Sequence, residues 1–430
     1  MHDVAVIGGG PGGSTAAALL AGAGRDVVVL ERERFPRFHV GESLLPWNMR
    51  IFERLGVVDA LRGAFIDKWG VEFVSSRGDL GSTFHFDRAI DSRYPSCFEV
   101  QRSRFDEILL RNAAARGAAV REGVTVTEAR RTSDGWTLGC RGEDGEPPVV
   151  TARYLLDASG REGFMARRLG LRNADPSSRR AALFAHYRGI HRAPGRDAGN
   201  IVIVMMRDGW IWFIPFADGT TSVGLVADGA SFARTRLSNE EALGEGIRRC
   251  PAARERTRGA ERITPVLGAS DWSYVCRGIA GDGYLMVGDA AAFVDPVFSS
   301  GVLLAMTSAE AAAGLLEEAL GSGRPSRARW SAYERELLSH AVTYRRMVDL
   351  FYSRAFASLC LNPSERFGLT GAVMSLLAGC LDPGWSVRWR LELFYALGAL
   401  FNRMGVGPRV DLHGVFEESA EPGTRGGRAA

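Results

Sequence analysis

The sequence predicts an α/β protein with a Rossmann-like nucleotide-binding domain, an antiparallel β-sheet lobe interleaved with it, and a C-terminal helical region. Three observations support this prediction. The chain opens with a strand, a glycine-rich turn and a helix of small residues, which together begin a βαβ unit. Buried-strand patterns return at 154–160 and 284–289, whereas 181–228 alternates as antiparallel strands do. Residues 327–410 are helical in pattern throughout.

The opening turn carries the motif G-x-G-x-x-G at Gly8, Gly10 and Gly13. The first glycine permits a tight turn, the second lets the backbone approach a pyrophosphate, and the third lets helix and strand pack closely. The helix that follows directs its positive end at the phosphates. Glu31 ends the second strand, where its carboxylate can accept a hydrogen bond from a ribose hydroxyl. The sequence therefore predicts dinucleotide binding, although this motif alone does not separate FAD from NAD.

The strand and helix patterns divide the chain into three structured parts and a tail. The expected parts are 1–175 with 270–325 (a discontinuous nucleotide-binding domain), 70–100 with 176–269 (a β-sheet lobe on the substrate side), 326–412 (a helical domain that covers the substrate) and 413–430 (a disordered, polar tail). Sheet segments thus lie between pieces of the nucleotide-binding domain along the chain.

Composition argues against several classes of function. The formal net charge of +3 gives no field that calls for nucleic acid or an anionic membrane. The six cysteines include no C-x-x-C pair and the seven histidines show no ligand spacing, so neither a metal site nor a disulfide framework is expected. The uncharged stretch 367–381 is too short to span a bilayer. The nucleotide-type motif begins at residue 4, so we expect no signal peptide and a cytoplasmic protein.

One residue type is nearly absent. Of the 53 basic residues, only Lys68 is a lysine. Arginine replaces lysine in most surface roles but cannot deprotonate to a nucleophilic amine. A solvated, idle side chain is the ordinary interpretation of a single lysine, and the alternative is that Lys68 carries chemistry.

Three further segments resemble the signatures of the p-hydroxybenzoate hydroxylase-like flavoproteins. Gly281–Pro296 is similar to their second FAD signature, in which an aspartate, here Asp289, holds ribityl or pyrophosphate oxygens. Val100–Leu110 resembles their helix start, whose arginine, here Arg102, lies beside the FAD. Asp157–Gly160 resembles their third signature. Taken alone each segment is an ordinary turn at a strand end, but their order implies a Rossmann-like FAD-binding domain.

Two longer motifs resemble those of the flavin-dependent halogenases. Trp210 and Trp212 belong to W-x-W-x-I-P, and 293–301 matches F-x-x-P-x-x-S-x-G. By pattern alone the tryptophans are a packed strand face. The resemblance implies that they keep organic substrate from the flavin, that Pro296, Gly301 and Val302 lie along the flavin, and that backbone amides at Ser300 and Gly301 bind halide, as amides at a helix start do.

Residues 34–46 resemble the halogenase strap, the segment that connects the cofactor with the substrate site, and Gly41 and Ser43 are its expected cofactor contacts. The family places its essential lysine shortly after this strap, and Lys68 stands there. One departure concerns the motif serine. Tryptophan halogenases carry a glutamate before it, whereas this chain has Phe298, the form found in phenol and pyrrole halogenases. Free tryptophan is therefore disfavoured as the substrate, and no general base can be named.

The resemblance implies an FADH2-dependent halogenase. A separate flavin reductase would supply FADH2, O2 and chloride or bromide would give hypohalous acid, and Lys68 would direct the halogen to an electron-rich phenolic or pyrrolic ring, free or tethered to a carrier protein. Lys68 would act as a hydrogen-bonding ammonium or as a haloamine. Three alternatives stay open: an FAD-dependent aromatic hydroxylase, a prenyl-chain reductase of the same superfamily, and a non-enzymatic scaffold that binds a carrier protein.

Overall fold

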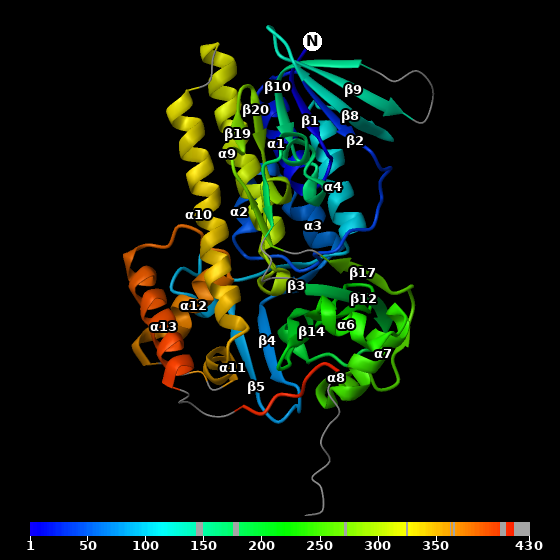
Figure 1. Ribbon diagram of the computed structural model, residues 1–430, viewed down its shortest axis with the longest axis vertical. Coiled ribbons are helices and arrows are strands. Elements are labelled where there is room, and N and C mark those ends of the chain that lie inside the picture. Colours follow the sequence, from blue (N-terminus) through cyan, green and yellow to red (C-terminus); the bar gives the residue numbers. More distant parts are fainter. Residues whose placement is uncertain are drawn as a thin grey trace, which may run out of the picture.

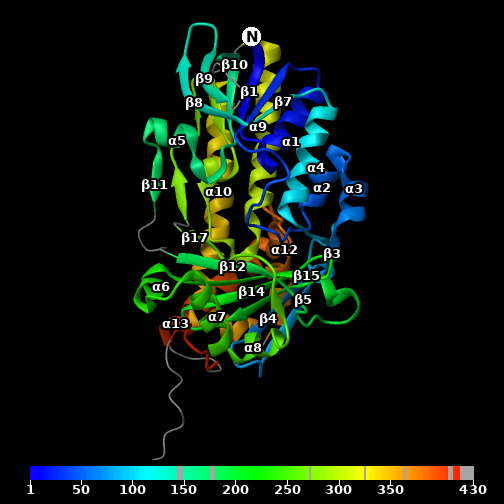
Figure 2. The ribbon, with the colours of Figure 1, turned by 90° about the vertical axis from the view of Figure 1, so that its right-hand side faces the viewer.

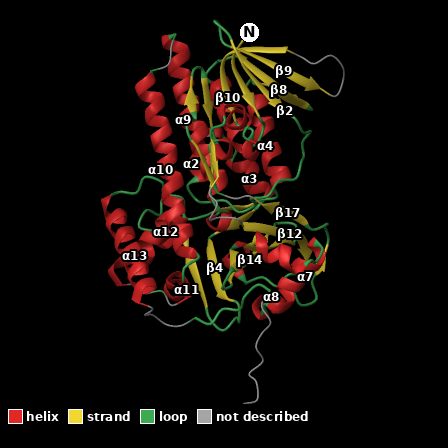
Figure 3. Ribbon diagram, viewed as in Figure 1, coloured by secondary structure: helices red, strands yellow, loops and turns green. Residues whose placement is uncertain are grey.

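A computed structural model describes residues 1–142, 149–174, 180–270, 273–323, 326–361, 363, 366–404 and 410–416. The chain forms an upper lobe built on a parallel sheet and a lower lobe built on a second sheet, with helices along one side of both (Figure 1). Colouring by secondary structure separates the two sheets clearly (Figure 3).

The upper sheet is mostly parallel and has the order β19-β20-β10-β1-β2-β7. Its strands are β1 (His2–Ile7), β2 (Val27–Glu31), β7 (Ala119–Glu122), β10 (Val149–Asp157), β19 (Ala280–Gly281) and β20 (Tyr284–Met286), and the hairpin β8 (Val124–Arg131) and β9 (Trp136–Gly142) pairs antiparallel with β10. The runs Val4–Ile7 and Val27–Leu30 are buried, as expected for strands covered on both faces. The parallel strands β1, β2, β7, β10 and β20 come from distant parts of the chain and therefore end at the same edge of this sheet.

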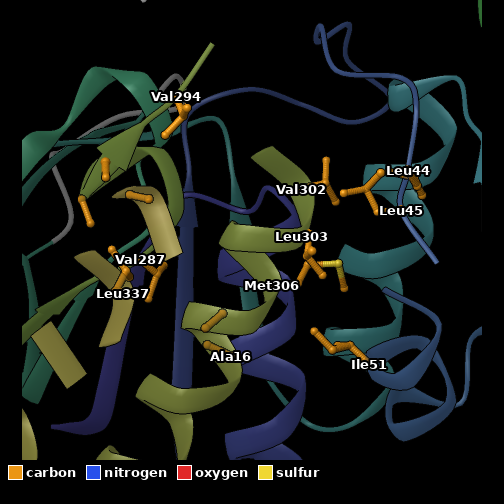
Figure 4. Close-up of a cluster of buried hydrophobic side chains, with 14 of the residues drawn as sticks. Ala16, Leu44, Leu45, Ile51, Val287, Val294, Val302, Leu303, Met306 and Leu337 are labelled. Carbon is orange, nitrogen blue, oxygen red and sulfur yellow. The ribbon is translucent and has the colours of Figure 1, made fainter. Parts of the chain in front are cut away.

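In this lobe the helix α1 (Pro11–Gly22) packs against both α4 (Arg102–Ala115) and α9 (Ser300–Ser322). Small residues on α1 let α9 approach closely, and Figure 4 shows Leu303 and Met306 of α9 between Ala16 of α1 and the apolar side chains of Leu44, Leu45 and Ile51. Shorter helices α2 (Asn48–Leu55), α3 (Val58–Ala64) and α5 (Phe164–Leu169) complete the lobe. The start of α9 is thereby fixed against the glycine-rich turn.

The lower sheet has the order β16-β12-β15-β14-β13-β4-β5, with β17 paired to β12. Its strands are β4 (Gly70–Ser75), β5 (Gly81–His85), β12 (Arg180–Arg188), β13 (Ile201–Met205), β14 (Gly209–Pro215), β15 (Thr220–Asp228), β16 (Glu261–Arg262) and β17 (Leu267–Ser270). All pairs are antiparallel except β13 with β4, which are parallel. Helices α6 (Gly229–Thr235), α7 (Asn239–Arg249) and α8 (Pro251–Arg256) accompany this sheet (Figure 2).

Two small sheets complete the strand inventory. One joins β3 (Ile66–Lys68) to β6 (Cys97–Glu99), and the other joins β11 (Arg172–Ala174), β18 (Tyr274–Cys276) and β21 (Ala292–Phe293). β6 lies in the segment predicted for the lower sheet, but it pairs with β3 instead. This pairing brings the strand that carries Lys68 beside the strand that precedes α4.

The C-terminal region is helical, as predicted, with α10 (Arg327–Phe351), α11 (Arg354–Leu361), α12 (Leu369–Leu377) and α13 (Trp385–Met404). α10 runs beside α9 in the upper lobe and reaches the other three helices beside the lower lobe (Figure 1). No helix among the described residues is long and apolar enough to cross a membrane.

The structure confirms the α/β class with an FAD-domain-like parallel sheet, a second sheet and C-terminal helices. It differs from the prediction at the tail. Residues 413–416 were expected to be disordered, yet the Val415 side chain is fully buried and its N–H donates to Asp208 at 2.8 Å. Phe416 packs on Phe232 with ring centroids 5.4 Å apart. The rest of the predicted tail, 417–430, lies outside the described residues.

Candidate functional site

A cavity of about 430 Å³ lies where the carboxyl ends of the parallel strands meet the lower sheet. It is lined by the glycine-rich turn, the strap, the turn after β10, the tryptophans of β14 and the segment from β20 to the start of α9. Its lining residues include Gly8, Gly10, Glu31, Arg37, His39, Gly41, Ser43, Arg102, Ile201, Trp210, Trp212, Asp289, Pro296, Ser299, Gly301 and Val302. In the doubly wound sheets, ligands bind at this edge.

Of the three motif glycines, only Gly10 leaves open space where a bound phosphate could approach the backbone. A Cβ on Gly8, where φ is +99°, would lie 2.4 Å from the Ala158 carbonyl oxygen, and one on Gly13 would lie 1.9 Å from the Gly8 oxygen. A Cβ on Gly10 would find Arg37 Nη2 at 3.5 Å and nothing closer. Gly8 and Gly13 are therefore required by packing, while Gly10 opens to the cavity just before α1 begins. This is the arrangement that a pyrophosphate requires.

Glu31 is held at the cavity wall by backbone donors. Its carboxylate accepts from the N–H of Gly9 at 2.6 Å and from the N–H of Glu33 at 2.9 Å. A carboxylate has about four acceptor positions, so these two bonds orient the group and leave capacity for a hydroxyl. The geometry fits a ribose at this point.

Asp289 lies in the turn η4 (Gly288–Ala290), which follows β20 and lines the same cavity. Burial raises the pKa of its carboxyl to about 6, while the nearby Arg161 and Arg102 favour the charged form. A carboxyl that is costly to bury is accommodated when it accepts a hydrogen bond. The polyhydroxyl side of FAD supplies such donors, so the residues present fit this cofactor from Gly10 through Glu31 to Asp289.

Arg102 fixes the strap. Its guanidinium is paired with Asp106 through contacts of 2.7 and 2.9 Å, and it also donates to the carbonyls of Val40 at 2.7 Å and Gly41 at 3.3 Å. Gly41 adopts φ +99°, and a Cβ there would lie 3.1 Å from Arg102 Nη1. The resemblance assigned Arg102 to the cofactor. In the structure it lines the cavity and chiefly holds the strap against α4.

Lys68 lies at the wall of a second, much smaller cavity of about 20 Å³. The side chain is 1% exposed, and Nζ donates to Ser43 Oγ at 2.7 Å and to the Leu44 carbonyl at 3.0 Å. Burial lowers the pKa of Lys68 below its ordinary value, and the nearby Glu99 and Cys97 oppose this shift. The remaining lining is largely apolar and comes from Leu45, Val71, Phe73, Phe86, Ile201, Ile203, Val297, Phe298, Ser299 and Leu377.

Glu99 is a buried acid that sequence reasoning missed. It is 0% exposed and lies opposite Ser43 in an isolated β-bridge. Its carboxylate oxygens make no hydrogen bond of standard geometry among the described residues, although the Ser43 hydroxyl and the Ile201 N–H lie close enough to favour the charged form. Burial raises the pKa of Glu99 to about 8, with Lys68 opposing the rise. The β3–β6 pairing creates this neighbourhood, and no local sequence signal reports it.

The two tryptophans lie on one face of β14 with ring centroids 5.6 Å apart. Trp210 Nε1 donates to the Tyr352 hydroxyl at 2.9 Å, and Trp212 Nε1 donates to Ser222 Oγ at 3.1 Å. Both line the large cavity and neither lines the small one. Ile201 and Ser299 line both cavities, so the cofactor cavity and the Lys68 cavity adjoin at these two residues.

The second motif forms the turn η5 (Pro296–Phe298) and the start of α9. Ser299 adopts φ +57°, which sharply redirects the chain, and Ser300 is 1% exposed. A Cβ on Gly301 would meet nothing within 4 Å. The first N–H groups of a helix have no partner within the helix, so this end of α9 presents donors beside an open space. Pro296, Gly301 and Val302 line the large cavity, and Ser300 does not.

Comparison with known proteins agrees with this geometry. A family model described as FAD binding domain matches residues 1–347, which defines the chain as an FAD-binding flavoprotein. The chain is 31% identical over 408 residues to the 1H-pyrrole-2-carbonyl-peptidyl-carrier-protein chlorinase of Pseudomonas fluorescens, covering 89% of this chain and 90% of that protein.

Solved structures share the fold over nearly the whole chain. The fold matches the flavin-dependent brominase Bmp2 with a TM-score of 0.82 and 27% identity, covering 93% of this chain and 99% of that one. It matches a flavoprotein/dehydrogenase from Cytophaga hutchinsonii with a TM-score of 0.85 and 29% identity, covering 94% and 99%. The chain belongs to the flavin-dependent halogenases, enzymes that halogenate aromatic substrates with FAD as cofactor.

Proposed function

We propose that this enzyme uses FADH2 from a separate flavin reductase, together with O2 and chloride or bromide, to halogenate a phenolic or pyrrolic ring through Lys68. The observation that carries the proposal is the position of the only lysine. Its Nζ is buried at a small cavity that shares Ile201 and Ser299 with the cofactor-sized cavity. A reagent released beside the flavin thus has a short route to one amine and no comparable amine elsewhere.

Bound, reduced FAD supplies the oxidation of halide by O2 to hypohalous acid. The protein's own groups then act on that reagent. Lys68 Nζ uses two of its three hydrogen-bonding directions on Ser43 Oγ and Leu44 O. The third direction holds a hydrogen in the ammonium and a lone pair in the amine. The ammonium would donate a hydrogen bond to HOX, while the amine would react as R–NH2 + HOX → R–NHX + H2O.

The amine route closes with R–NHX + ArH → R–NH2 + ArX, in which the halogen moves to the ring and the ring hydrogen returns to nitrogen. Burial of Lys68 favours the neutral amine this route needs. The apolar surroundings also exclude water that would dilute the reagent. Trp210 and Trp212, on the wall of the large cavity, are assigned to keep the organic substrate from the flavin.

The substrate class follows from two observations. Phe298 lines the Lys68 cavity at the position where tryptophan halogenases carry a glutamate. Two relatives that match nearly the whole chain are a chlorinase and a brominase of 1H-pyrrole-2-carbonyl on a peptidyl-carrier protein. We infer an electron-rich phenol or pyrrole, with the carrier-tethered form as the first to test.

The test is an incubation of holoprotein with a flavin reductase, NADH, O2 and chloride or bromide. The substrates are free phenols and pyrroles and the same rings as carrier-protein thioesters. Mass spectrometry is expected to show product with the isotope pattern of the supplied halogen. Hydroxylated product alone, with no halogen pattern for any substrate, would overturn the proposal in favour of an aromatic hydroxylase.

A further inference from the structure

The Tyr352 hydroxyl connects Trp210 of the tryptophan motif with Asp295 of the motif that precedes α9. It accepts a hydrogen bond from Trp210 Nε1 at 2.9 Å and donates one to Asp295 Oδ2 at 2.9 Å. An indole can only donate and a carboxylate can only accept, so the direction of both bonds is fixed. Tyr352 directly follows the last residue of α10, so this chain of bonds begins in the C-terminal helical region.

Asp295 is completely buried and does two things at once. Oδ2 accepts from Tyr352, and Oδ1 accepts from the Val297 N–H at 3.1 Å, which caps η5. The Arg180 guanidinium lies over the Tyr352 ring, 3.3 Å from its centroid, with Nε 3.9 Å from Oδ2. Burial raises the pKa of Asp295, and Tyr352, Val297 N–H and Arg180 favour its charged form. The carboxylate is therefore held by three separate parts of the chain.

The turn that Asp295 caps leads directly into Ser299 and the first amides of α9. A rotation of η5 would move those amides, because only Ser299, at φ +57°, lies between the end of η5 and the first residue of α9. Trp210 at the other end of the bonded chain forms part of the large cavity wall. One tyrosine thus ties α10, the tryptophan strand and the turn before the α9 amides into a single unit.

We propose that Tyr352 is a positioning residue for halide binding: through Asp295 it fixes the turn that presents the α9 amides, and through Trp210 it ties that turn to the cofactor cavity. The inference rests on the proposed function, since it assigns halide to those amides. It goes further by naming a residue of the C-terminal region that never touches the halide but sets the geometry of its site.

The first test is Tyr352→Phe, which keeps the ring against Phe351 and Arg180 and removes only the hydroxyl. The halide KM is expected to rise about tenfold while kcat changes by less than about threefold, because one lost hydrogen bond to a buried charged group shifts an equilibrium by roughly that factor. Bromide and chloride are titrated against product formation on a compound that the wild type halogenates. FAD occupancy, read from flavin absorbance, is expected to be unchanged.

Tyr395→Phe is the matched control. Its hydroxyl is also buried in the C-terminal helices but makes no hydrogen bond among the described residues. A general loss of packing in these helices would affect both variants, whereas the proposed role predicts a wild-type halide KM for Tyr395→Phe. Equal KM shifts in the two variants would overturn the proposal.

Asp295→Asn extends the test to a cycle. In Asp295→Asn the amide oxygen is expected to keep the bond from the Val297 N–H, which places the amide nitrogen, a group that cannot accept, where Oδ2 accepts from Tyr352. Because the Tyr352–Asp295 bond is then absent in either variant, the double variant is expected to raise the halide KM little more than either alone. Multiplying effects would show that the two residues act separately and would overturn the coupling. Wild-type protein without halogenase activity would instead defeat the proposed function, whereas an active wild type with an unshifted Tyr352→Phe KM would defeat this inference alone.

Discussion

The two cavities of this enzyme differ in size by an order of magnitude. The cofactor cavity holds about 430 Å³, and glycines and charged residues line it together with many apolar side chains. The Lys68 cavity holds about 20 Å³, and apart from Lys68 and Ser299 its lining residues are apolar. The smaller volume suffices for one or two water-sized molecules. Hypohalous acid fits there, and an aromatic ring does not.

This difference teaches that the two halves of the reaction rest on different kinds of structure. Under the proposed function, the oxidant would be made in a preformed site that strand ends and glycine turns fix. The halogen would be delivered at the smaller cavity, which would have to widen for the ring at a wall that includes Phe298 and Leu377 of α12. Changes in the first half should abolish activity without changing selectivity, and changes in the second should change which ring is accepted.

The largest expected effect is at Lys68. Lys68→Arg retains the charge but cannot form a neutral amine or fit the Ser43 and Leu44 acceptors in the same way. We expect aromatic halogenation to fall at least about 100-fold, the usual scale for losing a positioned proton-transfer group. Flavin absorbance should report unchanged FAD binding. Near-normal turnover in this variant would show that the amine is not required.

The next effect concerns the large cavity. A Cβ at Gly301 meets nothing within 4 Å, so Gly301→Val would project its isopropyl group into the space kept for flavin and halide. We expect affinity for FAD or halide to fall about tenfold, because overpacking costs about 1–3 kcal/mol. Equilibrium titration measures both affinities.

Gly314→Val is the control for this substitution, since Gly314 lies on the same helix, also in open space, and away from the cavity. Both variants place a β-branched residue in α9. If Gly314→Val weakened binding as much as Gly301→Val, helix propensity and not the cavity would be the cause.

A smaller effect tests the wall of the Lys68 cavity. Leu377→Ala is expected to cost about 2–5 kcal/mol of the free energy of unfolding, as for other buried leucines, and to raise the relative kcat/KM for bulkier rings. Leu376→Ala is the comparison, because Leu376 is equally buried on α12 but does not line the cavity. Urea unfolding should report similar losses, and only Leu377→Ala should change the ranking of substrates.

The smallest effect is a pH dependence in the strap. Burial and the nearby Arg102 lower the pKa of His39 from 6.5 to about 4. Between pH 6.5 and about 4 the unfolded chain therefore has His39 protonated, whereas the folded protein keeps it neutral. The free energy of unfolding is therefore unaffected by this group above pH 6.5 and decreases as the pH falls toward 4. Thermal unfolding of the FAD-free protein should show a smaller loss between pH 7 and 5 in His39→Gln than in the wild type. Equal losses would assign the acid sensitivity to other groups.

The sequence correctly placed Gly8, Glu31 and Asp289 together at one cavity, for a physical reason. Gly8, Glu31 and Asp289 each stand at the end of a buried strand, and parallel strands end at one edge, so local pattern and order place them together. The parallel order β20-β10-β1-β2 realises this arrangement.

For the Lys68 site, the sequence predicted only where the lysine lies along the chain, and not which residues surround it. Ser43 lies 25 residues away from Lys68, and Glu99 reaches it through the pairing of β3 with β6, whose register no local pattern reports. The tryptophans were correctly paired on one strand face, but which cavity they line depends on how two sheets meet. Val415 was missed because its burial comes from contacts with Asp208 and the lower sheet, not from its polar neighbours in sequence.

Trapping of free oxidant in Lys68→Ala tests the separation of the two cavities most directly. The variant would be incubated with reductase, NADH, O2, bromide, an aromatic substrate and an excess of an added small amine that captures hypohalous acid. The account predicts that the amine trap is halogenated at nearly the wild-type rate of oxidant formation while the aromatic substrate is not. Normal halogenation of the aromatic substrate, or loss of trap halogenation together with it, would contradict the division of labour between the two cavities.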